Sequence, residues 1–195
     1  GHFLVAVAEM LRAMRMEEER LSPTEAASAV LRDNLFGLEI DPRCTQLAAF
    51  ALALDAWRAG GYQILPVPNI ACTGMAVKGQ IEDWRRLAGA DERMRMALDR
   101  LYTLFQEARE LGSLIDPIAA AGDDLWKVDA DELVNKLQDA LRKEANDPAA
   151  AVFGEAVEGT AKAARLLARP YWLVATNPPF LGRGKMAGAL KAFVL

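Results

Sequence analysis

One stretch near the carboxyl end of this chain is more informative than any other: Tyr171-Trp172-Leu173-Val174-Ala175-Thr176-Asn177-Pro178-Pro179-Phe180. Residues 171–176 form an apolar run that predicts a buried β-strand. The two prolines that follow cannot extend a β-ladder, so the strand should end there in a stiff turn. This turn carries an amide side chain and an aromatic ring, and open α/β sheets bind ligands at the carboxyl ends of their strands.

A second strand is predicted over residues 34–40, and it leads directly into a helix. Asp41 fits the N-cap position of that helix, and Pro42 fits its first position. The helical pattern continues to Trp57, and Gly60-Gly61 should end the helix.

Glu39 and Ile40 stand at the end of this second predicted strand. An acid at such a place commonly holds the hydroxyls of a cofactor ribose, and an apolar neighbour can pack on an adenine. Both residues are therefore candidates for cofactor binding. The alternative is that Glu39 and Asp41 only cap the helix or face solvent.

The tetrad Asn177-Pro178-Pro179-Phe180 resembles the catalytic motif of DNA amino-methyltransferases that modify the exocyclic nitrogen of adenine. Residues 1–8 resemble the end of the glycine-rich first motif of the same enzymes, although Gly1-His2 can also be read as the remnant of an expression tag. The resemblance is nearest to the methyltransferases of bacteriophage-exclusion systems and to the fused type IIG restriction-modification enzymes.

Residues 66–75 resemble the third strand of that family and the loop after it. Thr73 and Met75 stand where an acid or amide is often found, so a polar contact from this loop to a cofactor adenine is in doubt, while Gly74 allows close backbone approach. With this segment the resemblance covers about two-thirds of the chain.

The resemblance implies a role for each residue of the tetrad. The side-chain oxygen of Asn177 and the main-chain carbonyl of Pro178 would accept the hydrogens of the adenine amino group and direct its lone pair at a methyl donor. Pro179 stiffens the turn, and Phe180 would stack on an adenine flipped out of the duplex. The implied cofactor is S-adenosyl-L-methionine, with candidate contacts from Gly1, Phe3, Glu39, Ile40 and Gly74.

The resemblance also implies an α/β fold: a partial Rossmann-like class I methyltransferase fold, helix-rich overall and truncated at both ends. Residues 1–79 would be a partial cofactor-binding half, residues 80–168 a helical insertion, and residues 169–195 the catalytic strand and loop. The insertion should contain helices over residues 81–111 with a break near Gly89, from Asp129 through Leu141, and over residues 149–167. We expect this insertion to be scaffold, and the alternative is a lid, a spacer or a partner-docking arm.

Composition narrows the class of protein. With 52% hydrophobic and 26% charged residues the chain resembles a soluble globular protein, and no apolar run reaches membrane-spanning length. His2 is the only histidine, and Cys44 and Cys72 lack the spacing of metal ligands. These features argue against a metal site and fit a reduced, cytoplasmic setting.

The net charge of −4 is unevenly distributed. Residues 159–195 hold six basic residues and no acidic one, so the preceding 158 residues carry −10. Positive charge therefore gathers around the tetrad, where phosphates would pass, and Arg183 and Lys185 are candidate contacts to double-stranded DNA. The alternative is a basic flank with no partner.

Three functions remain open at this point. The first is a fragment of an adenine-specific DNA methyltransferase from a restriction-modification or phage-defence system, with a nuclease or defence complex as possible partners. The second is methylation of protein glutamine or of RNA, and the third is a non-catalytic helical interaction module. The third predicts that Asn177→Ala changes nothing measurable.

Overall fold

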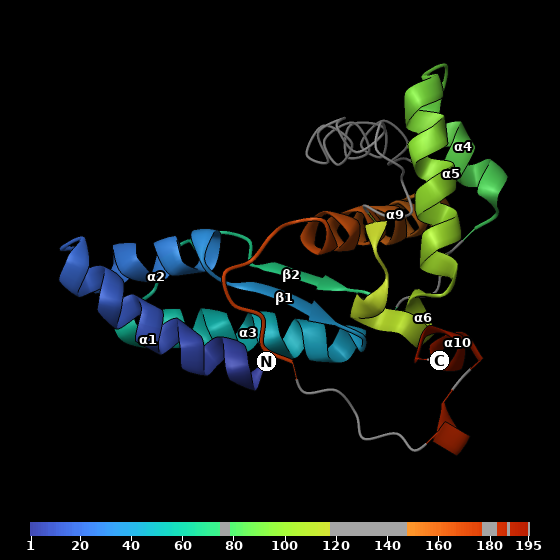
Figure 1. Ribbon diagram of the computed structural model, residues 1–195. Coiled ribbons are helices and arrows are strands. Elements are labelled where there is room, and N and C mark those ends of the chain that lie inside the picture. Colours follow the sequence, from blue (N-terminus) through green and yellow to red (C-terminus); the bar gives the residue numbers. More distant parts are fainter. Residues whose placement is uncertain (75–78, 118–147, 177–182, 187, 195) are drawn as a thin grey trace. The chain divides into compact units, whose positions relative to one another are not determined.

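The computed structural model describes residues 1–74, 79–117, 148–176, 183–186 and 188–194. They divide into two compact units, Gly1–Ala71 and Cys72–Leu195. Figure 1 shows the helices and strands that make up each unit.

The first unit contains α1 (His2–Glu18), α2 (Pro23–Asp33), β1 (Phe36–Glu39), α3 (Pro42–Gly60) and most of β2 (Asn69–Cys72). Local signals set several of these limits. The Ser22 hydroxyl accepts a hydrogen bond from the Glu25 amide at 3.3 Å, and the Glu25 carboxylate accepts one from the Ser22 amide at 2.9 Å, which starts α2. Gly61 follows α3 with a φ of 83°, a value that favours glycine.

β1 and β2 pair as neighbours in a small sheet, and their arrows in Figure 1 point the same way. α3 crosses between them, so β1, α3 and β2 form a parallel βαβ unit. α1 and α2 pack on each other and on α3. Burial of a side chain such as that of Leu52 contributes about 1.5–3 kcal/mol to stability. The core of this unit consists of Ala8, Ala27, Val30, Leu31, Leu35, Ala48, Leu52, Ala56 and Ile70.

The second unit is built from helices in its described part. They are α4 (Ile81–Ala88), α5 (Glu92–Gln106), α6 (Ala108–Leu111), η1 (Gly112–Leu114), α9 (Pro148–Leu167), η2 (Arg183–Lys185) and α10 (Gly188–Val194). α4 and α5 form a hairpin that turns at Gly89, whose φ is 57°. Trp84 packs edge-on against Tyr102 with ring centroids 5.7 Å apart, and α9 contacts α5. The buried side chains include Trp84, Leu98, Leu101, Phe105, Val157 and Leu166.

Most of the elements predicted from the sequence are confirmed. The strand over residues 34–40 is β1, the strand within residues 66–75 is β2, and the helix over residues 149–167 is α9. The break near Gly89 separates α4 from α5. The predicted helix from Asp129 through Leu141 lies outside the described residues.

The prediction of a buried strand over residues 171–176 is wrong for this structure. The segment has no strand conformation, and Trp172, Leu173 and Val174 are almost entirely exposed. A strand needs a hydrogen-bonded neighbour and a covered face, and in the described part of the chain the sheet pairs only β1 with β2. Apolar composition gives this segment strand propensity, but among the described residues it pairs with no other strand.

The described residues thus form a helix-rich structure with a small parallel sheet, which is compatible with an α/β fold. The predicted division of the chain after residues 79 and 168 stays a prediction.

Candidate functional site

Glu39, the predicted ribose-binding acid, is the last residue of β1 and is half-buried. Its Oε1 accepts hydrogen bonds from the backbone amides of Ile40 at 2.8 Å and Asp41 at 3.2 Å. These bonds hold the carboxylate at the turn between β1 and α3, at the carboxyl end of the strand. Ile40 beside it is 49% exposed, so its side chain offers an apolar surface at the same turn.

Asp41 caps the start of α3, as predicted. Its Oδ1 accepts from the Arg43 amide at 2.8 Å, and Pro42 takes the first helical position. The Arg43 guanidinium also contacts the carboxylate at 2.6 Å. The hydrogen bonds from the side chain and backbone of Arg43 lower the pKa of Asp41 to about 2, so this cap is ionised at neutral pH.

The contribution of Arg43 was not predicted from the sequence. An arginine two residues after an N-cap aspartate can reach back to the carboxylate, so the pattern Asp41-Pro42-Arg43 held a usable signal. The added ion pair fixes the turn that carries Glu39.

Gly1 and Phe3 lie at the amino end of α1, in the same unit as Glu39 and Ile40. A Cβ atom on Gly1 would sit 3.3 Å from the Cβ of Ala48, so glycine allows the start of α1 to approach α3 closely. Gly1 provides no side-chain cap, and Phe3 is 57% exposed. Uncapped amides at a helix start suit an anionic group.

Gly74 follows β2 and is half-buried, next to the buried Thr73. It belongs to the second unit, whereas the other four candidate cofactor residues belong to the first. Met75 lies outside the described residues.

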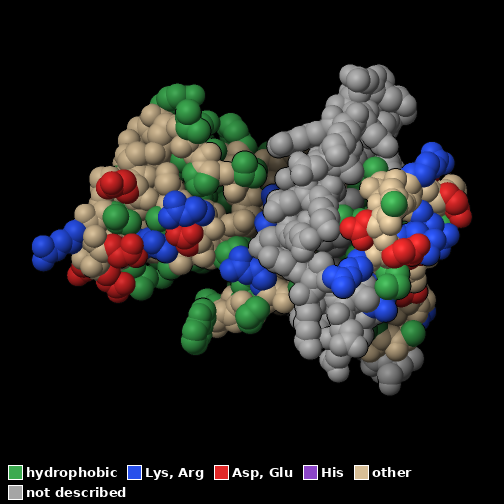
Figure 2. Space-filling model, turned by 90° about the horizontal axis from the view of Figure 1, so that it is seen from above, with side chains coloured by type: hydrophobic (Ala, Val, Ile, Leu, Met, Phe, Trp, Pro, Cys, Tyr) green, Lys and Arg blue, Asp and Glu red, His purple; other side chains and the backbone are tan. Residues whose placement is uncertain are grey.

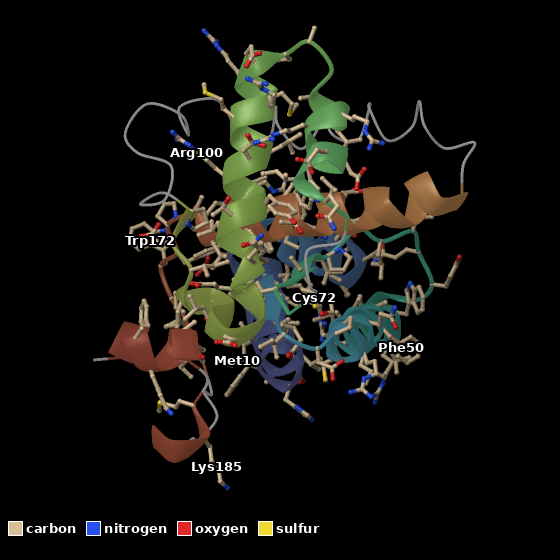
Figure 3. The ribbon with its side chains drawn as sticks, turned by 90° about the vertical axis from the view of Figure 1, so that its right-hand side faces the viewer. Met10, Phe50, Cys72, Arg100, Trp172 and Lys185 are labelled. Atoms are coloured by element: carbon tan, nitrogen blue, oxygen red, sulfur yellow. The ribbon has the colours of Figure 1, made fainter. Side chains whose placement is uncertain are left out.

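The tetrad Asn177-Pro178-Pro179-Phe180 also lies outside the described residues, but its flanks are described. On the upstream side, the Tyr171 hydroxyl donates a hydrogen bond to the Leu166 carbonyl of α9 at 2.7 Å. On the downstream side, Arg183 and Lys185 fall in η2, and Figure 3 shows the Lys185 side chain pointing away from the ribbon.

The described surface of the first unit carries charges of both signs. Figure 2 shows Lys and Arg side chains interleaved with Asp and Glu side chains on the face that the view presents. Two of the ion pairs of this unit are Arg15–Glu19 and Arg32–Asp33. This face of the first unit is therefore not a single-sign surface of the kind that holds nucleic acid.

No group of three or more His, Cys, Asp or Glu side chains among the described residues is placed to hold a metal ion. No helix in the described ranges is long and apolar enough to cross a membrane.

Open α/β sheets bind ligands at the carboxyl ends of their strands, and Glu39 stands at such an end. Two curated adenine-specific methyltransferases match this chain over nearly its whole length, which supports a methyltransferase family.

The first relative is the adenine-specific methyltransferase PglX of Lacticaseibacillus casei (strain Zhang). It is 27% identical over 204 residues, which cover 100% of this chain and 16% of that protein. The second is the adenine-specific methyltransferase BrxX of Escherichia coli O9:H4 (strain HS), 26% identical over 234 residues, 99% of this chain and 17% of that protein. The chain thus spans about one sixth of the length of these relatives. No family model and no solved structure matches the sequence.

Proposed function

We propose that this chain is part of an S-adenosyl-L-methionine-dependent DNA methyltransferase that modifies the exocyclic N6 amine of adenine in a restriction-modification or phage-defence system. The observation that carries the proposal is the match of nearly the whole chain to two relatives named adenine-specific methyltransferases. Because the chain spans about one sixth of those relatives, the activity is proposed for the protein that contains it.

In this proposal the tetrad acts on the flipped base. The amino group of adenine is a weak nucleophile because its lone pair is delocalised into the ring. The side-chain oxygen of Asn177 and the main-chain carbonyl of Pro178 would accept its two hydrogens, which turns the lone pair out of the ring plane. Phe180 would stack on the base and hold it outside the duplex.

S-adenosyl-L-methionine supplies the electrophilic methyl group when it is bound. The donor set at the end of β1 fits such a molecule, since a carboxylate can accept from ribose hydroxyls and an apolar side chain can cover an adenine. Glu39 would accept from the ribose hydroxyls, and Ile40 would cover the adenine. Gly1 and Phe3 at the start of α1 would face the amino-acid end of the cofactor. Gly74 would permit close approach of the loop after β2.

DNA would be held by basic residues near the tetrad, with Arg183 and Lys185 on the phosphates. The carboxyl-terminal segment 159–195 carries six basic residues and no acidic one, which supports this assignment.

The test is methyl transfer by the native full-length protein that contains this chain, with labelled S-adenosyl-L-methionine and duplex DNA. We expect label in N6-methyladenine after nuclease digestion. Asn177→Ala should lower kcat by roughly 10²–10³-fold, the usual loss when one preorganised polar group of an active site is removed, without weakening cofactor binding. Asn34→Ala is the matched control, because it makes the same chemical change at an exposed position. The side-chain oxygen of Asn34 accepts a hydrogen bond from Arg15.

The other outcomes separate the competing functions. Label in RNA or in protein glutamine, with none in DNA, would overturn the proposed substrate. Absence of both transfer and cofactor binding would instead favour an interaction module.

A further inference from the structure

Three basic residues lie together at the carboxyl-terminal end of α9. Lys162 and Arg165 are three positions apart on the helix, which puts their side chains on one face. Arg169 follows four positions after Arg165, just past the end of the helix, where its amide donates to the Leu166 carbonyl at 3.5 Å. Lys162, Arg165 and Arg169 form the α9 basic row.

The first two charges of the row are close enough to repel each other. Burial lowers the pKa of Lys162, and repulsion from Arg165 lowers it further, while Glu158 acts in the other direction. The charged form of Lys162 is therefore disfavoured where it stands.

Arg165 and Arg169 are drawn together by their common neighbour Tyr171. The Tyr171 hydroxyl is held in place because it donates a hydrogen bond to the Leu166 carbonyl at 2.7 Å. Burial raises the pKa of Tyr171, whereas the positive charges of Arg169 and Arg165 act in the other direction. Both guanidinium groups thus lie near one point at the end of α9.

The sequence around the row supplies little negative charge. Glu158, four positions before Lys162, is the one acidic residue within a helical turn of the row along the chain, and residues 159–195 contain no acid. Three arginines on α4 and α5 differ in this respect, because each forms an ion pair with the acid three positions before it. These arginines are Arg85, Arg86 and Arg95.

Helix stability does not account for this arrangement. A cation in the last turn of a helix is favoured by the helix dipole, and Arg165 stands in that turn of α9. The dipole does not explain why Lys162, half-buried and repelled by Arg165, is also charged. A row of phosphate groups beside the three cations would relieve this repulsion, and closely spaced phosphates are the main electrostatic feature of DNA.

We infer that the α9 basic row binds the phosphate backbone of duplex DNA, in addition to the contacts proposed for Arg183 and Lys185. The inference rests on the proposed DNA methyltransferase function and assigns α9 a part in holding its substrate. Phosphate contacts fix the position of a protein on the duplex but carry no sequence information. The row should therefore strengthen binding to all DNA sequences alike.

The test measures equilibrium binding of the native full-length protein to duplex DNA over a range of salt concentrations, without methyl transfer. Each phosphate contact that is lost should reduce the slope of log affinity against log salt by about 1. Arg165→Gln/Arg169→Gln should thus reduce the slope by about 2 and weaken binding to unrelated duplexes by the same factor.

Two double variants are the controls. Arg165→Lys/Arg169→Lys keeps both charges and should keep most of the slope. Arg86→Gln/Arg95→Gln removes the same charge from α4 and α5, where these arginines pair with acids at 2.8 Å and 2.7 Å, and should leave the slope unchanged.

A further variant separates binding from folding. Lys162→Met should reduce the slope by about 1 without lowering the stability of the protein, since the charge that it removes is disfavoured on folding. Thermal unfolding of each variant measures stability alongside binding.

An unchanged slope in Arg165→Gln/Arg169→Gln or in Lys162→Met would overturn the inference, as would an equal reduction in Arg86→Gln/Arg95→Gln. Because binding is measured without turnover, the expected slopes together with no methyl transfer would refute the proposed function and leave the DNA contact standing. A wild-type protein that binds RNA but no duplex DNA would overturn both.

Discussion

The guanidinium group of Arg12 in α1 contacts the carboxylate of Asp55 in α3, and these side chains are only 13% and 21% exposed. Removing one partner would leave the other charge partly desolvated. We therefore expect Arg12→Met to lower the free energy of unfolding by about 1–3 kcal/mol, between the values typical of exposed and buried pairs. The double variant with Asp55→Leu should lose less than the sum of the two single variants, as measured by urea denaturation.

The control for this ion pair is Arg32–Asp33, whose side chains are 63% and 38% exposed. Arg32→Ala should cost less than about 0.5 kcal/mol, as expected for a surface change. Equal losses at Arg12 and Arg32 would contradict the idea that burial makes the first pair matter.

Two leucines two positions apart on α3 offer a matched comparison. Leu52 is 1% exposed and belongs to the core of the first unit, whereas Leu54 is 44% exposed. Leu52→Ala should lower the free energy of unfolding by about 2–5 kcal/mol, because it removes buried surface and leaves a cavity.

Leu54→Ala makes the same chemical change and should cost less than about 1 kcal/mol. Chemical denaturation of both variants, with the same probe, makes the comparison. A similar loss at both positions would mean that Leu54 is covered in the native protein. The exposed row Leu47, Phe50 and Leu54, of which Figure 3 labels Phe50 on α3, makes this a useful check.

Structural features were predictable from the sequence when the residues that interact lie close to one another along the chain. The start of α3 at Asp41-Pro42 and its end at Gly61 rest on residues within a few positions of one another. Interactions between near neighbours can be predicted from the order of the residues, and the predicted ends of this helix are confirmed. The same holds for the break at Gly89.

Contacts between distant residues could not be predicted in this way. Residues 171–176 have the composition of a buried strand, but burial depends on a neighbouring strand, which composition does not specify. The bond from Ala189 to Glu110 joins residues 79 positions apart, and Arg12 meets Asp55 across 43 positions. The roles assigned to Glu39, Ile40, Gly1, Phe3 and Gly74 stay predictions, because they depend on a cofactor.

The pH dependence of the α3 cap is the third prediction. The pKa of Asp41 is lowered from 3.8 to about 2, chiefly by its hydrogen bonds with Arg43, so its charge favours the folded state. This contribution is fully present above pH 3.8 and is lost as the pH falls toward 2. Asp41→Asn keeps a good capping side chain but cannot ionise.

Wild type should therefore be more stable than Asp41→Asn at pH 6, and the difference should shrink as the pH falls toward 2. Urea midpoints of the two proteins across this range measure it, and effects of other carboxylates cancel in the difference. A difference that stays constant with pH would show that the ion pair with Arg43 does not stabilise the cap.

The fourth prediction concerns Lys162 of α9, whose charge disfavours the folded state, whereas the charge of Asp41 favours it. Burial lowers the pKa of Lys162 from 10.5, repulsion from Arg165 lowers it further, and Glu158 acts in the other direction. The charged form is therefore disfavoured on folding, so Lys162→Met should be at least as stable as wild type at neutral pH. This penalty is full below the folded pKa and disappears as the pH rises to the unfolded value of 10.5.

The stability of wild type relative to Lys162→Met should thus increase with pH in the alkaline range, because the unfolded chain there binds more protons at this site than the folded chain does. Thermal unfolding at pH 7 and near pH 10.5 measures the change. Lys191→Met in α10 is the control, because Lys191 is exposed and its replacement removes the same charge without a burial penalty. A clear loss of stability in Lys162→Met at pH 7 would mean that the attraction to Glu158 outweighs desolvation and repulsion, and that α9 depends on this lysine for its packing.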